Sequence, residues 1–212
     1  MELLTVIAII GVLMALTISG LGTMREKSRA AVCASNLRQC GVALNLYANE
    51  NRNLFPAALE VDLRSWAVEL GRGGYLPRLV EDAPSVVACP STSTEGRYVE
   101  FRRVYGLWAG NAAYGVFQFN RDIACYRLSR QRLEPDRIIM ADSGRAVYSE
   151  GWDPTYFIMS GTGQRETNAA NKVINLIHGG KANALFADGH VEKVDPVRLE
   201  RDGRYNWTRY TN

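Results

Sequence analysis

The N-terminal end of this sequence lacks charge. No charged residue lies between Glu2 and Arg25, and Leu, Ile, Val, Ala and Met dominate the stretch. As a helix that rises about 1.5 Å per residue, it would measure roughly 30 Å, the hydrocarbon thickness of a bilayer. A signal peptide would open with basic residues and close with a small-residue cleavage site, and neither pattern occurs here. We therefore expect residues 1–24 to form a membrane-spanning helix, rather than a signal peptide or a core helix.

The sequence also lacks the motifs of common enzymes. It contains no Gly-x-Ser-x-Gly, no His-Glu-x-x-His and no phosphate-binding loop. The chain has two histidines in total, so a Ser-His-Asp triad would have to use His178 or His190. Ser143 beside Asp142 is the one nucleophile in a suggestive turn, and turn formation explains that pair. The net charge of +3 is too small to indicate a nucleic-acid partner. We expect no catalysis, no cofactor and no nucleic acid.

Proline is absent before Pro56, and a helical pattern continues beyond the apolar stretch. Apolar or small residues recur at spacings of 3, 4, 3, 4 and 3, which is one narrow stripe on a helix. They are Ala30, Cys33, Leu37, Cys40, Leu44 and Tyr47. We expect a single helix of about fifty residues that stops near residues 49–53. Residues 25–55 would form its amphipathic continuation, packed on a domain of residues 56–212.

The remainder of the chain is typical of an α+β domain, so we expect the long helix to pack on an antiparallel sheet. A short helix is expected at residues 61–70. Strands are expected at residues 86–88, 101–108, 114–119, 125–128 and 137–141, with the second and third of these paired. Residues 151–171 are polar and interrupted by Pro and Gly, and predict no regular element. Residues 172–177, 182–187 and 190–194 predict a three-stranded antiparallel meander.

The turn in this meander bears on a possible metal site. Asp188-Gly189 is a strong two-residue hairpin signal, and a type I′ turn would need positive φ at both residues. His178, Asp188 and His190 are residue types that bind zinc or iron. However, a strand at about 3.3 Å per residue would separate His178 from Asp188 by well over 20 Å. We therefore expect a turn at Asp188 and no metal shared by these three side chains.

Two separate motifs carry a resemblance to a known family. The segment from Glu2 to Leu13 and the continuation from Cys33 to Gln39 resemble the N-terminal helix of type IV pilins and type II secretion pseudopilins. His178, nine intervening residues and Asp188-Gly189 resemble the H-x9-D-G motif at the C-terminal end of many prepilin-like proteins. The resemblance also implies a basic leader ahead of Met1.

The resemblance implies a pilin-like fold and a structural role. The protein would be a subunit of a type IV pilus-like or type II secretion pseudopilus filament, assembled through N-terminal helices of identical or related subunits. A prepilin peptidase, inner-membrane assembly machinery and the lipid bilayer are the further partners implied. The chain would span the inner membrane once, with its domain outside the cytoplasm and the filament in the periplasm or at the cell surface. Taken alone, the basic residues Arg25, Lys27 and Arg29 would place that domain in the cytoplasm instead.

Glu2 is the residue to which the resemblance gives an assembly role. In that family, the carboxylate pairs with the N-terminal amine of a neighbouring subunit and sets the stagger of the helices. A weaker role is favourable interaction with the dipole of its own helix. The rival function is a single-pass anchored extracytoplasmic domain that binds a ligand and never polymerises.

The four cysteines lack the Cys-x-x-Cys spacing of many metal sites. An exported domain, as the resemblance implies, would lie where disulfides persist. We expect a bond between Cys33 and Cys89, with Cys40 and Cys125 the next pair. Four buried free thiols are the alternative.

Overall fold

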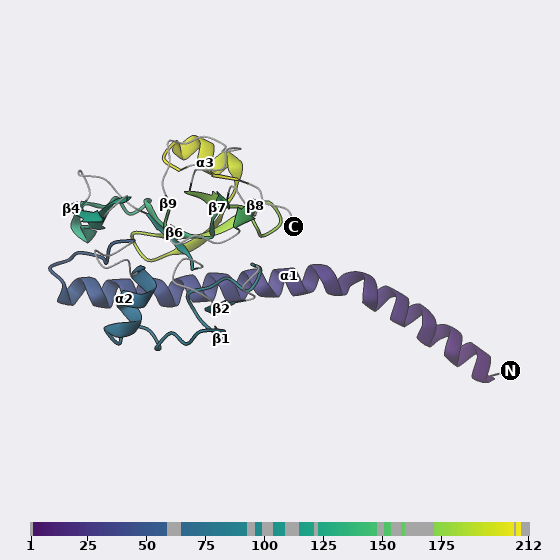
Figure 1. Cartoon of the computed structure of the whole chain (residues 1–212). Coiled ribbons are helices and arrows are strands. Elements are labelled where there is room, and N and C mark those ends of the chain that lie inside the picture. The colour runs from purple at the N-terminus through teal and green to yellow at the C-terminus, as the bar shows by residue number, and fades with distance from the viewer. Residues whose placement is uncertain are drawn as a thin grey trace.

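A computed structural model of the chain describes residues 2–58, 65–92, 96–98, 104–108, 115–120, 123–147, 151–153, 158–159, 172–205 and 207–208. These residues form an α+β fold, with one long N-terminal helix and sheets in which most strand pairs are antiparallel. Figure 1 shows the helix running beneath the sheets and continuing well beyond them toward the N-terminus.

The long helix, α1, spans Glu2–Glu50, which confirms the expected length. Every residue of the stripe from Ala30 to Tyr47 is buried, so the 3-4 spacing identified the face that packs on the domain. Arg52 and Asn53 have positive φ angles of 57° and 60° and turn the chain away from the helix axis. Phe55 then donates its backbone N–H to the carbonyl of Leu128.

A five-stranded sheet lies against α1, in the order β12-β11-β6-β3-β9. Its strands are β12 (Val191–Val194), β11 (Ala182–Phe186), β6 (Ile138–Ala141), β3 (Gly106–Trp108) and β9 (Ile158–Met159). All pairs are antiparallel except β3 with β9. At Gly41 a Cβ atom would lie 2.9 Å from Cδ1 of Leu185, so the missing side chain lets α1 approach β11 closely.

A four-stranded sheet has the order β13-β10-β7-β8, with β10 and β13 parallel. Its strands are β13 (Trp207–Thr208), β10 (Lys172–Asn175), β7 (Ser143–Val147) and β8 (Gly151–Asp153). The two sheets meet at Asp142, between β6 and β7. Its backbone N–H donates to the carbonyl of Asn183 in one sheet, and its carbonyl accepts from the N–H of Asn175 in the other. Asp142 therefore marks the corner where the chain passes between sheets.

Smaller elements complete the fold. They are α2 (Trp66–Arg72), β1 (Ala83–Pro84), β2 (Arg97–Tyr98), β4 (Gly115–Asn120), β5 (Ile123–Leu128), the 3-10 helix η1 (Arg130–Arg132) and α3 (Pro196–Asp202). β1 pairs with β2, and β4 with β5. Asp195 caps the start of α3, where its side chain accepts the N–H of Arg198, and Gly203 caps its end in the left-handed region.

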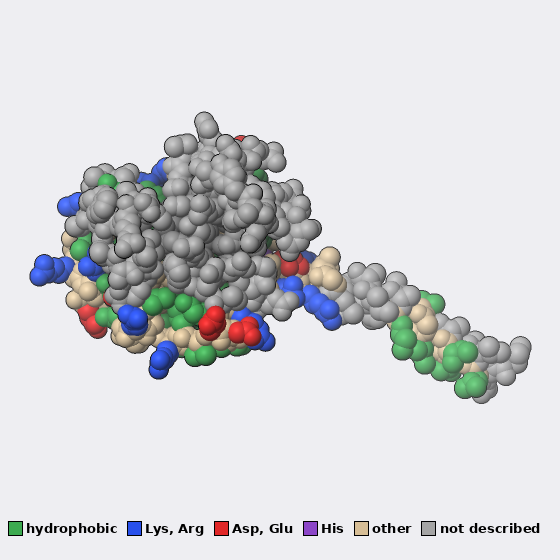
Figure 2. Space-filling view, in the orientation of Figure 1, with side chains coloured by type: hydrophobic (Ala, Val, Ile, Leu, Met, Phe, Trp, Pro, Cys, Tyr) green, Lys and Arg blue, Asp and Glu red, His purple; other side chains and the backbone are tan. Residues whose placement is uncertain are grey.

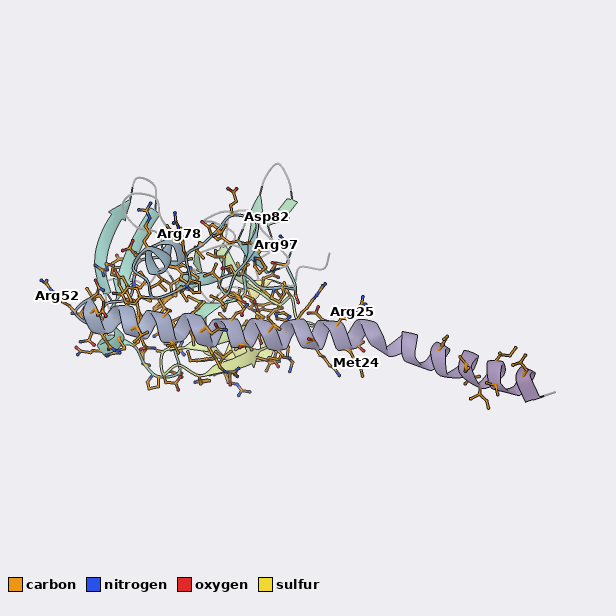
Figure 3. The ribbon with its side chains drawn as sticks, turned by 90° about the horizontal axis from the view of Figure 1, so that it is seen from below. Met24, Arg25, Arg52, Arg78, Asp82 and Arg97 are labelled. Atoms are coloured by element: carbon orange, nitrogen blue, oxygen red, sulfur yellow. The ribbon has the colours of Figure 1, made fainter. Side chains whose placement is uncertain are left out.

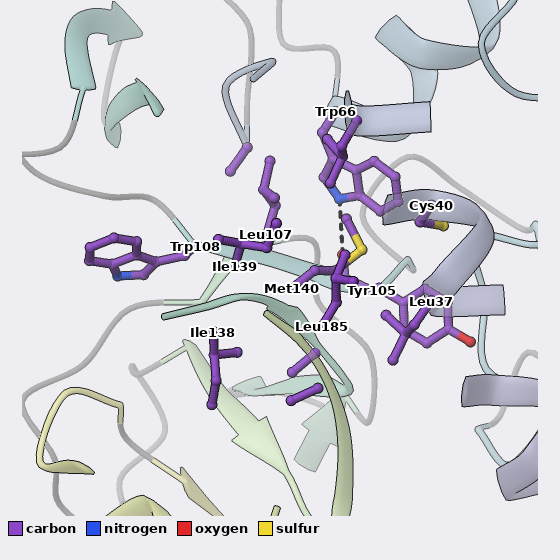
Figure 4. Packing of buried hydrophobic residues seen from close by; sticks show 14 of the residues in the cluster. Leu37, Cys40, Trp66, Tyr105, Leu107, Trp108, Ile138, Ile139, Met140 and Leu185 are labelled. Atoms are coloured by element: carbon purple, nitrogen blue, oxygen red, sulfur yellow. Dashed lines mark hydrogen bonds between the residues drawn. The ribbon is translucent and has the colours of Figure 1, made fainter. Parts of the chain in front are cut away.

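The core lies between α1, α2 and the five-stranded sheet. Leu37 and Cys40 of α1 are buried in this core together with Met140 and Leu185 of the sheet (Figure 4). Trp66 at the start of α2 is fully buried, and its indole N–H donates to the carbonyl of Tyr105 at 2.9 Å. The hydrogen bond lets the indole lie in the core without an unsatisfied donor.

Several strand predictions are wrong. β10 and β11 belong to different sheets, so the expected meander is reduced to the β11–β12 hairpin. Residues 86–88 form a turn instead of a strand, with Val87 and Ala88 buried. β4 pairs with β5, and not with the strand that ends at Trp108. β8 and β9 lie within 151–171, where we expected no element. The expected helix over 61–70 is described only from Trp66, while residues 59–64 lie outside the described part of the chain.

The β11–β12 hairpin closes with a three-residue loop, Ala187 to Gly189. Phe186 accepts the N–H of Gly189 and donates its own N–H to the carbonyl of His190. Gly189 has a φ of 93°, whereas Asp188 is not among the described residues with positive φ. The expected type I′ turn is therefore wrong, and the loop is the kind in which one residue, usually Gly, adopts the left-handed conformation.

We predict that Gly189→Val lowers the free energy of unfolding by more than about 1 kcal/mol, because a β-branched residue is strained at positive φ. Gly189→Asn is the matched control, since Asn tolerates this conformation and should lose clearly less. Urea denaturation of the full chain in mild detergent measures both values. Equal stability of the Val variant and the unsubstituted chain would contradict the assigned turn.

Candidate functional site

The first candidate site is the part of α1 that projects from the domain, residues 2–24, here called the N-terminal segment. Large apolar side chains on it are exposed, from 45% for Ile10 to 79% for Leu3. They are Leu3, Val6, Ile7, Ile9, Ile10, Val12, Met14 and Met24. In Figure 2 green side chains gather near the N-terminal end of the projecting helix, and in Figure 3 α1 leaves the domain near Met24 and Arg25. A group of exposed large apolar side chains normally marks a contact with a partner, such as another protein or a membrane.

Glu2 begins α1, but its side chain lies outside the described residues. Its expected pairing with a neighbouring subunit is therefore still a prediction. Among the residues that the structure describes, no helix meets the length and hydropathy needed to cross a membrane.

The second candidate site is a buried group of four side chains, here called the Cys-Asp-His cluster. Sγ of Cys33, Sγ of Cys89, a carboxylate oxygen of Asp142 and a ring nitrogen of His178 all lie within 4.8 Å of one another. Cys33 comes from the stripe of α1, Cys89 follows the turn after β1, Asp142 is the corner between the sheets, and His178 lies in the turn before β11. The cluster therefore joins α1 to three segments that are distant in sequence.

Hydrogen bonds fix the orientation of Asp142 and Cys33. The backbone N–H of Asn183 donates to Oδ2 of Asp142 at 2.8 Å, and the thiol of Cys33 donates to Oδ1 at 3.0 Å. The hydroxyl of Tyr105 lies 3.3 Å from Sγ of Cys33. The side-chain amide of Asn183 reaches α1 itself and donates to the carbonyl of Ala30. Both carboxylate oxygens are thus held by buried donors.

His178 has a different partner on each side of its ring. Nδ1 lies 3.0 Å from Oε1 of Glu26, which lies just past the end of the N-terminal segment. The carboxylate of Glu26 is itself held by the hydroxyl of Ser91. Nε2 faces into the cluster, 3.4 Å from Sγ of Cys89 and 3.3 Å from Oδ2 of Asp142.

Burial and charge shift the protonation of these groups in opposite directions. Burial raises the pKa of the Cys33 thiol well above its usual value, and it raises the pKa of Cys89 as well. Burial lowers the pKa of His178, but hydrogen bonds to Asp142 and Cys33 outweigh this effect and raise it to about 11. With protein groups alone around it, the raised pKa values favour neutral thiols at Cys33 and Cys89 and a protonated ring at His178.

Nucleophilic catalysis is a poor match to this arrangement. A catalytic cysteine needs a lowered pKa and access to substrate. Cys33 and Cys89 are buried with raised pKa values. Both cavities described, one over α2 and one beside Pro84 and Pro90, are lined by described residues outside the cluster. That the protein is not an enzyme remains a prediction.

The cysteines are only partly arranged as the sequence suggested. Cys33 and Cys89 are neighbours but are free thiols here, as is Cys40. The thiol of Cys40 donates to the carbonyl of Val86 at 3.4 Å and lies outside the cluster. Cys125 is in β5, and its side chain is outside the described residues. Neither disulfide is tested by this structure, so both remain predictions.

The two halves of the H-x9-D-G motif occupy different places. His178 is buried in the Cys-Asp-His cluster, whereas Asp188 lies on the exposed hairpin loop. Asp188 bonds the backbone N–H and ring of His190, and that ring stacks on Phe186. Among described residues, the groups near His178 are thus not those that the sequence motif pairs with it.

Sequence reasoning missed Glu26 and Asp142. Asp142 directly follows a buried apolar strand, a position where a turn former is ordinary, and we assigned it to a turn. Glu26 lies seven residues before Cys33, and therefore on nearly the same face of α1. That spacing was the one available signal for its role.

Comparisons with known proteins find no matching family model, no matching curated protein and no matching solved structure.

We predict that Asp142→Ala lowers the free energy of unfolding by about 3–5 kcal/mol, because it leaves a buried imidazolium and the Asn183 N–H without their acceptor. Asp188→Ala is the control, since an exposed pair contributes about 1 kcal/mol or less. Urea titrations compare the free energies of unfolding of the two variants. A chelator is present so that only protein groups contribute to the difference. Equal losses would contradict the assigned network.

Proposed function

We propose that the chain is a structural subunit of a filament of the type IV pilus or type II secretion pseudopilus kind. Its N-terminal segment would pack against the same segment of identical or related subunits. The observation that carries the proposal is the separation of α1 into an exposed apolar half and a half buried on the domain. The resemblance of the N-terminal sequence and of the H-x9-D-G motif to prepilin-like proteins supports it independently.

The energetic argument rests on the exposed apolar side chains. Complete burial of one Val, Leu, Ile or Met side chain contributes about 1.5–3 kcal/mol. Large apolar side chains project from the segment, and no charged residue lies between Glu2 and Arg25 in the sequence. Burial in a bundle of helices would recover this free energy, and residence in lipid would do so before assembly. The domain would then lie outside the cytoplasm, with the segment in the inner membrane.

Packing on the domain cannot use this surface. The stripe from Ala30 to Tyr47 already fills the contact with β11 and β12. α1 leaves the domain near Met24, and the described large apolar side chains of the segment are all exposed. A partner from outside the chain is therefore the consistent way to cover it.

We predict that Ile9→Lys abolishes filaments in cells, because a lysine in the middle of an apolar bundle would be buried without a partner. Val197→Lys is the matched control, since Val197 is similarly exposed, 63% against 60%, but lies on α3. Negative-stain microscopy and pelleting measure assembly. Filaments at normal levels from the Ile9 variant would refute packing through the N-terminal segment. Absence of filaments from the unsubstituted chain would instead favour a non-polymerising anchored domain.

Glu2 offers a second, sharper test. We predict that Glu2→Ala and Glu2→Gln, made in the native gene, both give a folded, membrane-associated subunit that does not enter filaments. A role limited to the dipole of α1 predicts instead a loss of about 1 kcal/mol or less, with assembly intact. Filament yield and membrane fractionation separate the two roles. Normal filaments from both variants would remove Glu2 from the assembly mechanism.

A further inference from the structure

We propose that the Cys-Asp-His cluster is a binding site for one Zn²⁺ ion, with Cys33, Cys89, Asp142 and His178 as its four ligands. Zinc is commonly bound by thiolate, imidazole and carboxylate, and structural sites supply four protein ligands in a tetrahedron. The cluster provides this number and these types of ligand from buried side chains.

The separations between ligand atoms fit a tetrahedral ion. Zinc–ligand bonds of about 2.0–2.3 Å at the tetrahedral angle place neighbouring ligand atoms roughly 3.3–3.8 Å apart. The structure has 3.4 Å between Sγ of Cys89 and Nε2 of His178, and 3.3 Å between Nε2 and Oδ2 of Asp142. Cys33 Sγ lies 3.0 Å from Oδ1 of Asp142, so small side-chain movements would complete the set.

The groups around the ligands are those that metal sites use. A zinc-binding histidine usually donates its second ring N–H to a carboxylate, which fixes the ring and its tautomer. Glu26 is such a carboxylate at Nδ1, and Ser91 holds Glu26 in turn. This leaves Nε2 directed at the ion. The N–H of Asn183 holds Oδ2 of Asp142 in the same way.

The charges balance when protons leave. Zn²⁺ would bind two thiolates, one carboxylate and one neutral imidazole. The two thiol protons and the Nε2 proton pass to solvent, so that the ion with its four ligands carries a charge of about −1. The buried cation supplies the stabilisation that two thiolates would otherwise lack in this environment.

The position of the site indicates what the ion would do. With all four ligands from the protein and buried, no coordination position remains for substrate, which is typical of a structural site. The ion would fasten α1 to the turn after β1, to the corner between the sheets and to the turn before β11. Its ligand on α1, Cys33, follows by nine residues Met24, near which α1 leaves the domain (Figure 3).

The decisive experiment measures metal in the full chain, purified in detergent without chelator. We expect about one zinc per chain by elemental analysis. Replacement with Co²⁺ should give the visible bands and the sulfur-to-cobalt charge-transfer band of tetrahedral thiolate coordination. Cys33→Ser and Cys89→Ser should each lose the zinc and the charge-transfer intensity. Cys40→Ser is the matched control, because Cys40 lies on the same buried stripe and should retain both.

Glu26 tests the positioning role separately. Glu26→Gln should still bind one ion, with an affinity reduced by about 10- to 100-fold in competition with a chelator, as for other such carboxylates. A purely structural salt bridge would leave zinc affinity unchanged.

Two results would overturn the proposal. One is wild-type protein with reduced thiols that neither contains zinc nor develops cobalt bands. The other is a peptide map of the native protein in which Cys33 is bridged to Cys89. Neither result depends on the variants folding, and neither would affect the filament proposal, which the Ile9→Lys and Val197→Lys pair tests independently.

Discussion

The structure depends on one helix that must satisfy two environments. From Ala30 onward, α1 buries one face, which widens after Cys40 to include Ala43 and Ala48, and this half of the helix packs on β11 and β12. Before Met24, the described side chains face away from the domain. Because isolated helices gain little from propensity alone, the packed half must hold the orientation of the whole element. Gly41 makes this contact close, since any side chain there would meet Leu185.

The corner at Asp142 is the second constraint, and it follows from the first. The backbone of Asp142 bonds one strand in each sheet, while its side chain turns toward α1 and accepts from Asn183. A buried carboxylate is costly unless it is fully paired. Cys33, His178 and Asn183 supply that pairing from three directions. α1, the corner at Asp142 and the turn at His178 therefore have to be in place together. Displacing one of them would leave the buried carboxylate of Asp142 without one of its partners.

The sequence could predict the features that depend on local interactions, but not those that depend on long-range contacts. The length of α1 and its buried face are local properties, and the spacing of apolar residues from Ala30 to Tyr47 indicates that face. Both predictions are confirmed. The β11–β12 hairpin is also local, because a short loop ending in Gly189 joins its strands. By contrast, β10 and β11 are adjacent in sequence, yet β10 pairs with β7 and β11 with β6. That choice depends on the corner at Asp142, which no short window of sequence reveals.

The candidate sites follow the same rule. The N-terminal segment is recognisable from composition, whereas the cluster joins residues as far apart as Cys33 and His178 and needed the fold to bring them together. The structure brings Cys33 and Cys89 together, and the disulfide between them is still a prediction, but the carboxylate and imidazole beside them could not be anticipated. The thiols alone carried no information about their third and fourth partners.

The continuity of α1 has a geometric consequence. An α-helix couples advance to rotation, with about 1.5 Å and 100° for each residue. In a single helix from Glu2 to Glu50, the axial position of the first half against a partner therefore fixes the rotation of the domain about the helix axis. A shift of one residue at the apolar end would swing the sheets and the β11–β12 loop through about a quarter of a circle. Only axial shifts of about 3.6 residues restore the original orientation of the domain, so the axial positions that preserve this orientation are discrete.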